Sequence, residues 1–286
     1  MPSPQVGHPD SDVCRLCGAQ SRLVSVQQVL YRYPVCYYQC PECDLLQTQR
    51  PYWLDEAYNA ALSALDTGAI SRTRLCTDLT RALAAVLRIN PNDPCIDFGG
   101  GHGILTRAMR DHGYDFRWHD KYAQNHFARR FEADPGQRHA LLTCFEVWEH
   151  LADVGRDLPV FFSPGHEYLL ISTYLHHGHR DNWWYYSCES GQHVAFFSDR
   201  TMRFVARRFG YEAVICQRYT LFHKPGLLTG WRRSAAQALL RRAKPQRNSR
   251  IVGVILSVSR PHKSRTWDDH VELMARGRQE ATPVAA

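Results

Sequence analysis

The spacing of apolar and polar residues divides the first third of the chain into two parts. The runs RLVSVQQVLY (22–31) and PVCYYQC (34–40) are rich in β-branched and aromatic residues, which is typical of strands. From residue 51 to residue 90 the spacing becomes helical, with apolar side chains three or four positions apart at Leu75, Leu79, Leu83, Val86 and Leu87. We therefore expect a β-rich module over 10–50 and a helical connector or lid over 51–90.

Strand and helix patterns then alternate from residue 91 to residue 260. The runs PCIDF, DFRWHD, HALLTCFEV and EYLLIST predict strands, GILTRAMRDHG and TMRFVARRFG predict helices, and YEAVICQRY and RIVGVILSVS predict the last two strands. This alternation predicts an α/β domain whose parallel sheet is covered by helices on both faces. The remaining residues, 261–286, form a polar tail that we expect to be loosely packed.

The composition is that of a globular protein, with 44% hydrophobic residues among 286. No stretch approaches the roughly 20 apolar residues of a membrane span, and the first residues, MPSPQVGHPD, lack the apolar core of a signal peptide. We expect a cytoplasmic protein without a transmembrane segment.

The net charge of +7 comes from one place. Residues 226–250 contain seven of the 35 Lys and Arg residues and no acid, so the other 28 basic residues balance the 28 acids. A general affinity for nucleic acid is therefore disfavoured, though not excluded. The stretch reads as a partly helical insertion between the last two strands. Its Trp231, Leu239 and Leu240 make it a candidate contact for an anionic membrane surface or a phosphate-bearing carrier, and a solvated helix is the alternative.

Four of the ten cysteines have the spacing of a metal site. Cys14 and Cys17 form one C-x-x-C pair, and Cys40 and Cys43 form a second. Two such pairs can present four thiolates to zinc in a tetrahedron. We therefore predict a structural zinc ion in a zinc-ribbon-like module over 10–50, with unliganded thiols as the alternative. The other cysteines lie among apolar neighbours and read as core residues.

The loop IDFGGGHGILT follows the first strand of the α/β domain. Gly99, Gly101 and Gly103 alternate, so the G-x-G-x-x-G spacing of dinucleotide-binding loops is absent, and no Gly-Lys-Ser or Gly-Lys-Thr of a P-loop follows. Asp97 precedes the glycines and would repel a pyrophosphate. Asp120, at the end of the second strand, lies where an acid can bind a ribose diol. The pattern favours a nucleoside ligand without that phosphate.

These residues resemble the first two motifs of class I S-adenosylmethionine-dependent methyltransferases. The resemblance implies a Rossmann-like, doubly wound, seven-stranded sheet. It also implies that Asp97 and the three glycines line the amino acid end of the methyl donor, and that Asp120 holds its ribose. The segment LTCFEVWEHL (142–151) is similar to the family's segment after strand four. By that resemblance Phe145 and Glu146 lie against the methionine and sulfonium of the donor. A solvated helix start is the alternative for Glu149 and His150.

A second distinctive segment, residues 183–211, combines clustered aromatic residues with His193. Aromatic faces make good floors for sugar rings. The portion GQHVAFFSDRTM resembles bacterial sugar methyltransferases, some of which also begin with a zinc-binding module, and in that group the matching histidine is assigned to base chemistry. His193 is therefore our candidate general base, with His150 and the pair Tyr185 and Tyr186 as helpers or acceptor contacts. The nearby His176, His177 and His179 read as a pocket-lining loop rather than a metal site.

The sequence thus predicts a zinc-containing, S-adenosylmethionine-dependent methyltransferase that acts on a sugar or carrier-linked sugar. Two hypotheses stay open beside it. The first is methylation of RNA or protein, with the zinc module and the basic stretch binding that substrate. The second is a non-catalytic scaffold that keeps the fold. O-, N- and C-methylation each need only alignment and a base, so the sequence does not choose among them.

Overall fold

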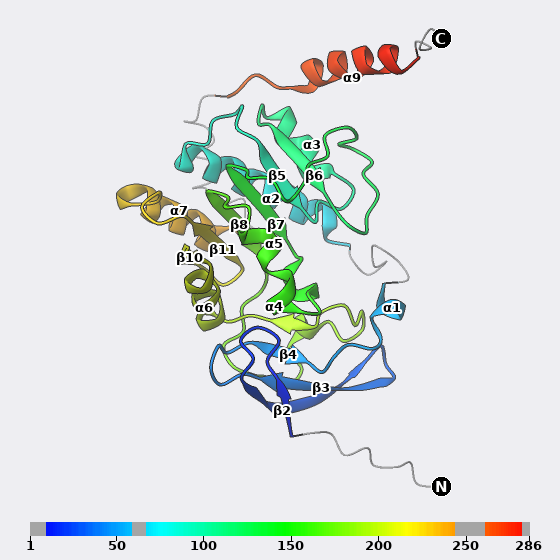
Figure 1. Ribbon diagram of the computed structural model, residues 1–286, viewed down its shortest axis with the longest axis vertical. Helices are drawn as coiled ribbons and strands as arrows, with labels where there is room; N and C mark the ends of the chain where they lie inside the picture. Colours follow the sequence, from blue (N-terminus) through cyan, green and yellow to red (C-terminus); the bar gives the residue numbers. More distant parts are fainter. Residues whose placement is uncertain (1–9, 59–66, 244–260, 282–286) are drawn as a thin grey trace. The chain divides into compact units, whose positions relative to one another are not determined.

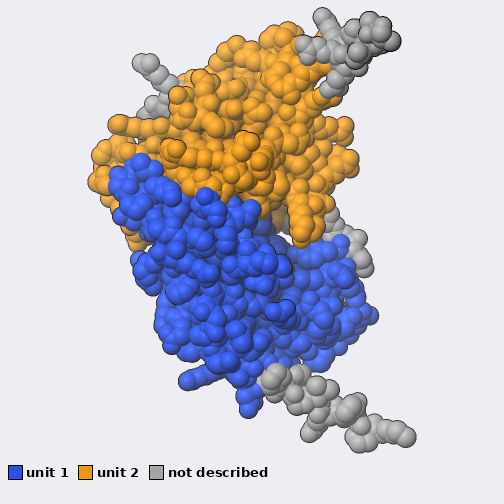
Figure 2. All heavy atoms as spheres, in the orientation of Figure 1, with its two compact units in different colours: residues 1–67, 144–163, 169–227 blue, residues 68–143, 164–168, 228–286 orange. Residues whose placement is uncertain are grey.

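A computed structural model describes residues 10–58, 67–243 and 261–281, with side chains described up to residue 276. The chain forms two compact units, which Figure 2 shows in different colours. Each unit is assembled from segments that are far apart in the sequence. Unit 1 contains residues 1–67, 144–163 and 169–227, and unit 2 contains residues 68–143, 164–168 and 228–286.

An antiparallel sheet dominates the N-terminal part of unit 1 (Figure 1). Its strands follow in the order β1-β2-β3-β4-β9, with the bounds β1 Ser11–Val13, β2 Gln20–Val29, β3 Tyr33–Gln39, β4 Leu46–Thr48 and β9 Ala195–Phe196. The two strands predicted between the cysteine pairs are confirmed as β2 and β3. The last strand was not foreseen: β9 pairs with β4 through Leu46↔Phe196 and Gln47↔Ala195.

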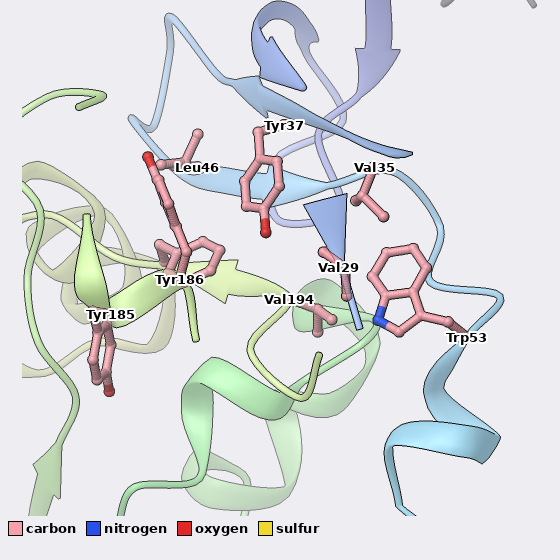
Figure 3. Packing of buried hydrophobic residues seen from close by; sticks show 9 residues of the cluster. Val29, Val35, Tyr37, Leu46, Trp53, Tyr185, Tyr186 and Val194 are labelled. Atoms are coloured by element: carbon pink, nitrogen blue, oxygen red, sulfur yellow. The ribbon is translucent and has the colours of Figure 1, made fainter. Parts of the chain in front are cut away.

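The core of unit 1 joins this sheet to the aromatic segment (Figure 3). Tyr185 and Tyr186 are each 2% exposed, and Phe196 is fully buried. They pack with apolar residues of the first strands and with Trp53, which precedes the short helix α1 (Leu54–Ala57). The expectation of an aromatic floor for a sugar is therefore wrong for these side chains, because they fill the core. Trp184, which is 67% exposed, remains at the surface.

The rest of unit 1 combines short helices with a second group of strands. The helical elements are η1 Trp148–His150, α4 Val154–Asp157, α5 Pro159–Phe162, η2 Trp184–Tyr186 and α6 Asp199–Phe209. β10 (Glu212–Ile215) pairs antiparallel with β11 (Tyr219–His223), and β11 is also the neighbour of β8 (Tyr168–Ser172). Ser198 begins α6 with a capping box, and Gly210 ends it at φ 71°.

Unit 2 contains the first strands of the α/β domain. Its elements are α2 Ala69–Leu87, β5 Cys95–Phe98, α3 Ile104–Asp111, β6 Phe116–His119, β7 Leu141–Phe145, α7 Gly230–Arg242 and α9 Thr266–Ala281. β5 pairs in parallel with both β6 and β7. The last two residues of β7 belong to unit 1, and so do all residues of β8 after Tyr168.

The parallel strands and their intervening helices fit the predicted Rossmann-like α/β fold. The count of seven strands stays a prediction, because the expected strand at 250–259 lies outside the described residues. The segment YEAVICQRY is a strand only as far as Ile215, and the next strand, β11, begins at its last residue, Tyr219. The basic stretch therefore follows the β10–β11 pair.

Helix α7 accounts for much of that basic stretch. Arg232 donates hydrogen bonds to the carbonyl oxygens of Val86 (3.1 Å) and Leu87 (2.9 Å), at the C-terminal end of α2. Leu239 and Leu240 are buried, so of the three apolar residues considered for a membrane contact only Trp231, at 65% exposed, stays accessible. Within the described residues, no helix combines the length and apolar character of a membrane span.

Residues 266–281 of the expected tail form a helix, α9, whose described side chains are mostly exposed, apart from Asp269. Asp269 is 3% exposed and accepts hydrogen bonds from Arg110 at 2.7 and 2.8 Å. Arg107 adds a third at 2.8 Å. Charges this deeply buried need partners, and the two arginines of α3 supply them, so the start of α9 is fixed to unit 2.

Candidate functional site

The glycine loop of unit 2 has a backbone that only glycine adopts easily. Gly99, Gly101 and Gly103 have φ values of 72°, 54° and 86°, in the left-handed region. A Cβ on Gly103 would also lie 2.7 Å from Oδ1 of Asn125. The loop links β5 to α3, and the indole Nε1–H of Trp118 donates to the carbonyl of Gly101 at 2.9 Å. The alternating glycines thus fix a tight strand-to-helix turn.

Asp97 lies beneath this loop and is 3% exposed. Its carboxylate accepts hydrogen bonds from Thr143 Oγ1 at 2.9 Å and from Thr106 Oγ1 at 3.3 Å. Burial raises the pKa of Asp97 to about 7, although these two hydroxyls favour the ionised form. A buried acid that titrates near neutrality binds a cationic group well once it is ionised.

Asp120 follows β6 and is tied to the same loop. Its Oδ2 accepts from the Gly101 N–H at 2.9 Å, and its Oδ1 accepts from the N–H groups of Tyr122 and Ala123 at 2.8 Å each. A carboxylate offers about four lone-pair sites. One of these sites therefore remains for a further hydrogen-bond donor. Asp97, Asp120 and the three glycines, all predicted as donor-site residues, lie together in unit 2.

The other two predicted donor contacts, Phe145 and Glu146, belong to unit 1. Glu146 has a φ of 55°, which is uncommon for a residue with a side chain. Ser172 holds it there, since its Oγ donates to Glu146 Oε1 at 2.5 Å and also accepts from the Glu146 N–H at 3.0 Å. Phe145 packs edge-on against Tyr219 at 6.5 Å between ring centroids. A strained backbone held by a hydrogen-bonded side chain is often found at functional sites.

Also in unit 1, four side chains form what we call the histidine cluster: Glu149, His150, Tyr185 and His193. The Tyr185 hydroxyl donates to Glu149 Oε1 at 2.6 Å. The His193 ring lies 4.7 Å from the Tyr185 ring and 5.0 Å from the His150 ring, measured between centroids. The cluster brings together three candidates that the sequence singled out, His150, Tyr185 and His193.

The tautomers of both histidines follow from their partners. Nδ1 of His193 lies 2.7 Å from the carbonyl oxygen of Tyr185, and Nδ1 of His150 lies 3.0 Å from that of Gln192. A carbonyl only accepts, so each Nδ1 carries the proton and each Nε2 keeps its lone pair. Desolvation lowers the pKa of both rings, that of His193 to about 3 with a further contribution from His150. Both imidazoles are therefore neutral, and each keeps an unprotonated Nε2.

Glu149 is the cluster member whose importance the sequence did not reveal. The alternative of a solvated helix start is wrong, because Glu149 is fully buried. Burial and the nearby charge of Glu146 raise its pKa to about 8. The apolar neighbours Trp148 and Leu151 were the available signal, since they indicate that η1 enters the core.

Tyr186 is separate from the cluster that we expected it to join. Its hydroxyl lies 2.8 Å from Nδ1 of His179, and its ring packs in the core. Adjacent residues of η2 point in different directions, so only Tyr185 of the predicted pair joins the cluster. Nor do the three nearby histidines converge: His176 Nε2 contacts the Asp44 carbonyl at 3.0 Å, and His177 Nε2 contacts Gln217 at 2.7 Å.

The four cysteines of the N-terminal module converge as the sequence predicts. Cys14, Cys17, Cys40 and Cys43 place their sulfur atoms within 4.8 Å of one another, with 3.5 Å between Cys14 and Cys43 and 3.5 Å between Cys17 and Cys40. Four sulfurs at 2.3 Å from one zinc ion would be separated by about 3.8 Å. The cluster therefore has the size and the donors of a tetrahedral metal site.

Arg15, between the first two cysteines, connects the cysteine cluster to the histidine cluster within unit 1. Its guanidinium donates to the carbonyl oxygens of Thr48 at 2.7 Å and Val194 at 3.0 Å. Val194 is the neighbour of His193, and its N–H donates to the Glu149 carbonyl at 2.8 Å. No local sequence pattern predicts this contact, because its partners are far apart along the chain.

The family of the chain follows from its similarity to a known protein family. A family model described as a methyltransferase domain matches residues 69–216, which is more than half of the chain. No curated protein matches significantly.

Similar solved structures include three methyltransferases. The first is magnesium protoporphyrin IX methyltransferase from Synechocystis. It is 13% identical, the match covers 61% of this chain and 97% of that chain, and the TM-score is 0.40. The second is 1,6-didemethyltoxoflavin-N1-methyltransferase from Burkholderia thailandensis. It is 13% identical, the match covers 70% of this chain and 97% of that chain, and the TM-score is 0.44. The third is a possible histamine N-methyltransferase from Thermotoga maritima. It is 11% identical, the match covers 55% of this chain and 91% of that chain, and the TM-score is 0.39. On the strength of the family match, the chain belongs to the methyltransferase domain family and is an S-adenosylmethionine-dependent methyltransferase.

Proposed function

We propose that the protein transfers the methyl group of S-adenosylmethionine to a sugar or carrier-linked sugar, with His193 as the general base. In this reaction the bond between the methyl carbon and the sulfonium sulfur breaks, and a bond from that carbon to the acceptor atom forms. The proton of the acceptor passes to Nε2 of His193, and S-adenosylhomocysteine leaves. The acceptor must be aligned with the sulfonium, and alignment supplies much of the rate enhancement.

The observation that carries this proposal is the fixed tautomer of His193. The hydrogen bond from Nδ1–H to the Tyr185 carbonyl orients the ring and leaves Nε2 as the acceptor atom. The partner of one ring nitrogen sets the tautomer, so Nε2 of His193 is the atom that can accept a proton. The sugar is supported by the resemblance of the His193 segment to sugar methyltransferases, together with the N-terminal cysteine module. The RNA, protein and scaffold hypotheses gain no support from the family match.

We also propose that the four cysteines bind a structural zinc ion. Four thiolates are the ligand set of closed structural sites, which leave no position for substrate. The site would stabilise the turns at both cysteine pairs and hold Arg15 against Thr48 and Val194. Chemistry at the methyl donor would be left to the rest of the protein.

The donor half of the proposal is tested by calorimetric titration with S-adenosylmethionine, with NAD as the negative control. Asp120→Ala is expected to weaken donor binding by roughly 10- to 100-fold, because a ribose hydrogen bond to a carboxylate contributes about 1.5–3 kcal/mol. Asp134→Ala is the matched control, since Asp134 is an exposed acid of the same unit whose Oδ1 accepts from the Gly136 N–H. Equal donor affinity in Asp120→Ala and wild type would remove Asp120 from the site. Once donor binding is established, nucleotide sugars are screened as acceptors.

A pH series tests the role of Asp97. In the free protein Asp97 is protonated below about pH 7, while the donor's amino group is positively charged and favours the carboxylate. Donor affinity should therefore fall as the pH falls, by roughly tenfold between pH 8 and pH 6. The Asp97→Asn variant should bind weakly and show a flat profile. A wild-type affinity that is constant from pH 8 to pH 6 would contradict the assignment.

A further inference from the structure

Three atoms of the histidine cluster lie close enough to share one ligand. Glu149, His150 and His193 each offer a ligand atom, and these atoms lie within 4.8 Å of one another. Neighbouring ligands around a first-row divalent ion at about 2.1 Å are separated by roughly 3–4 Å. A contraction of about 1 Å would therefore bring all three side chains to a single ion.

Both imidazoles are oriented in the way that metal ligands require. A ligating histidine almost always donates its other ring N–H to a carbonyl or carboxylate, which fixes the ring and directs the free lone pair at the metal. His150 does this toward the Gln192 carbonyl, and His193 does it toward the Tyr185 carbonyl. The two lone pairs on Nε2 have no such partner among the contacts of the described residues.

Glu149 supplies an independent observation. Its side chain is fully buried, and only one of its two oxygens has a hydrogen-bond partner, the Tyr185 hydroxyl. The other oxygen, Oε2, has none within the part of the chain that the structure describes. A buried carboxylate oxygen without a partner is costly, so such an oxygen points to a ligand that the protein is built to hold.

We infer that Glu149, His150 and His193 bind one first-row divalent cation, such as Mn²⁺, Fe²⁺ or Zn²⁺. Two imidazoles and a carboxylate suit these ions better than Ca²⁺ or Mg²⁺, which prefer sites made of oxygen alone. The Tyr185 hydroxyl would orient the carboxylate through its hydrogen bond to Oε1. This site is separate from the cysteine cluster in both residues and donor atoms.

The inference rests on the proposed function and changes the part that His193 plays in it. Three protein ligands leave coordination positions open, as in catalytic rather than structural sites. An acceptor hydroxyl bound there would have a lowered pKa and would release its proton to solvent. His193 would then bind the cation instead of the proton, and the acceptor would be methylated on oxygen.

The test uses the full-length protein with its cysteine cluster loaded with zinc. Mn²⁺ is added, and the free ion is followed by electron paramagnetic resonance. We expect one Mn²⁺ per chain, with at least tenfold weaker binding in Glu149→Gln and His150→Ala. Glu149→Gln keeps the volume and an acceptor for the Tyr185 hydroxyl, so folding should be preserved. His177→Ala is the matched control, because His177 is exposed and contacts only Gln217 among the described contacts.

Two results would overturn the inference. One is binding of Mn²⁺ that is equally tight in wild type, Glu149→Gln and His150→Ala. The other is a wild-type protein that, after incubation with Mn²⁺, Fe²⁺ or Zn²⁺, contains only the ion of its cysteine cluster by elemental analysis. Donor titration on the same samples keeps the two proposals apart. If no cation binds but donor binding and methyl transfer are normal, the inference is wrong and the proposed function is retained. If the wild type binds Mn²⁺ but no donor, the proposed function is wrong.

Discussion

Replacing Cys40 by serine is expected to abolish methyl transfer while donor binding stays within about 30-fold of wild type. The substitution removes one of four thiolates, and structural zinc contributes on the order of 10 kcal/mol to the folding of such modules. Without the ion the turns at the cysteine pairs lose their fixed geometry, and with them the contacts of Arg15 to Thr48 and Val194. His193 then loses its position. Of the donor contacts that we propose, only those of Phe145 and Glu146 belong to unit 1, and their loss would cost about 1 kcal/mol each.

The measurements are zinc content, donor titration and transfer of a labelled methyl group. Cys36→Ala is the matched control, because Cys36 lies in β3 of the same sheet but outside the four-cysteine cluster. It should keep one zinc ion and most of its activity. A Cys40→Ser protein with full zinc content and full transfer would show that the cluster is not a structural metal site.

Replacing His193 by alanine should lower kcat by roughly 10²–10⁴, the usual contribution of a positioned general base. The KM for the donor should change little, because all the donor contacts we assign involve other residues. The loss has the same sign whether Nε2 of His193 receives the proton or binds a cation, so kcat tests the importance of the residue and the Mn²⁺ titration tests its role.

His177→Ala is again the control for this measurement, as an exposed histidine of unit 1. Tyr185→Phe adds a graded comparison. It keeps the backbone carbonyl that orients His193 and removes only the hydroxyl that donates to Glu149. We expect a smaller loss of kcat in Tyr185→Phe than in His193→Ala. Unchanged kcat in His193→Ala, with an acceptor that wild type methylates, would remove this histidine from the mechanism.

Local patterns were enough to predict much of this fold. The cysteine pairs, the alternating glycines with their flanking acids, and the strands β2, β3, β5, β6, β7 and β8 are all set by residues close together in the sequence. Each depends on short-range chemistry: thiol spacing, positive φ at glycine, or runs of β-branched residues. Such signals need no knowledge of what packs against them.

The features that the sequence did not predict depend on distant partners. β9 is only two residues long and exists because it pairs with β4. The burial of Glu149 depends on how η1 packs with Trp148 in the core. The choice of Tyr185 over Tyr186 depends on the turn of a short 3₁₀ helix. Asp269 looked like a tail residue because its partner, Arg110, lies on a helix far away in the sequence.

The pairing of β4 with β9 has a consequence for biosynthesis. Gln47 and Ala195 are paired, so β4 waits for roughly 150 residues to be translated before its partner exists. At about 5–20 residues per second the ribosome needs on the order of 10–30 s for that length. During this time the nascent chain carries a sheet with an open edge, of the kind that promotes aggregation. Early capture of a metal ion by the four thiolates, all synthesised by residue 43, would hold the first strands together until the edge is covered.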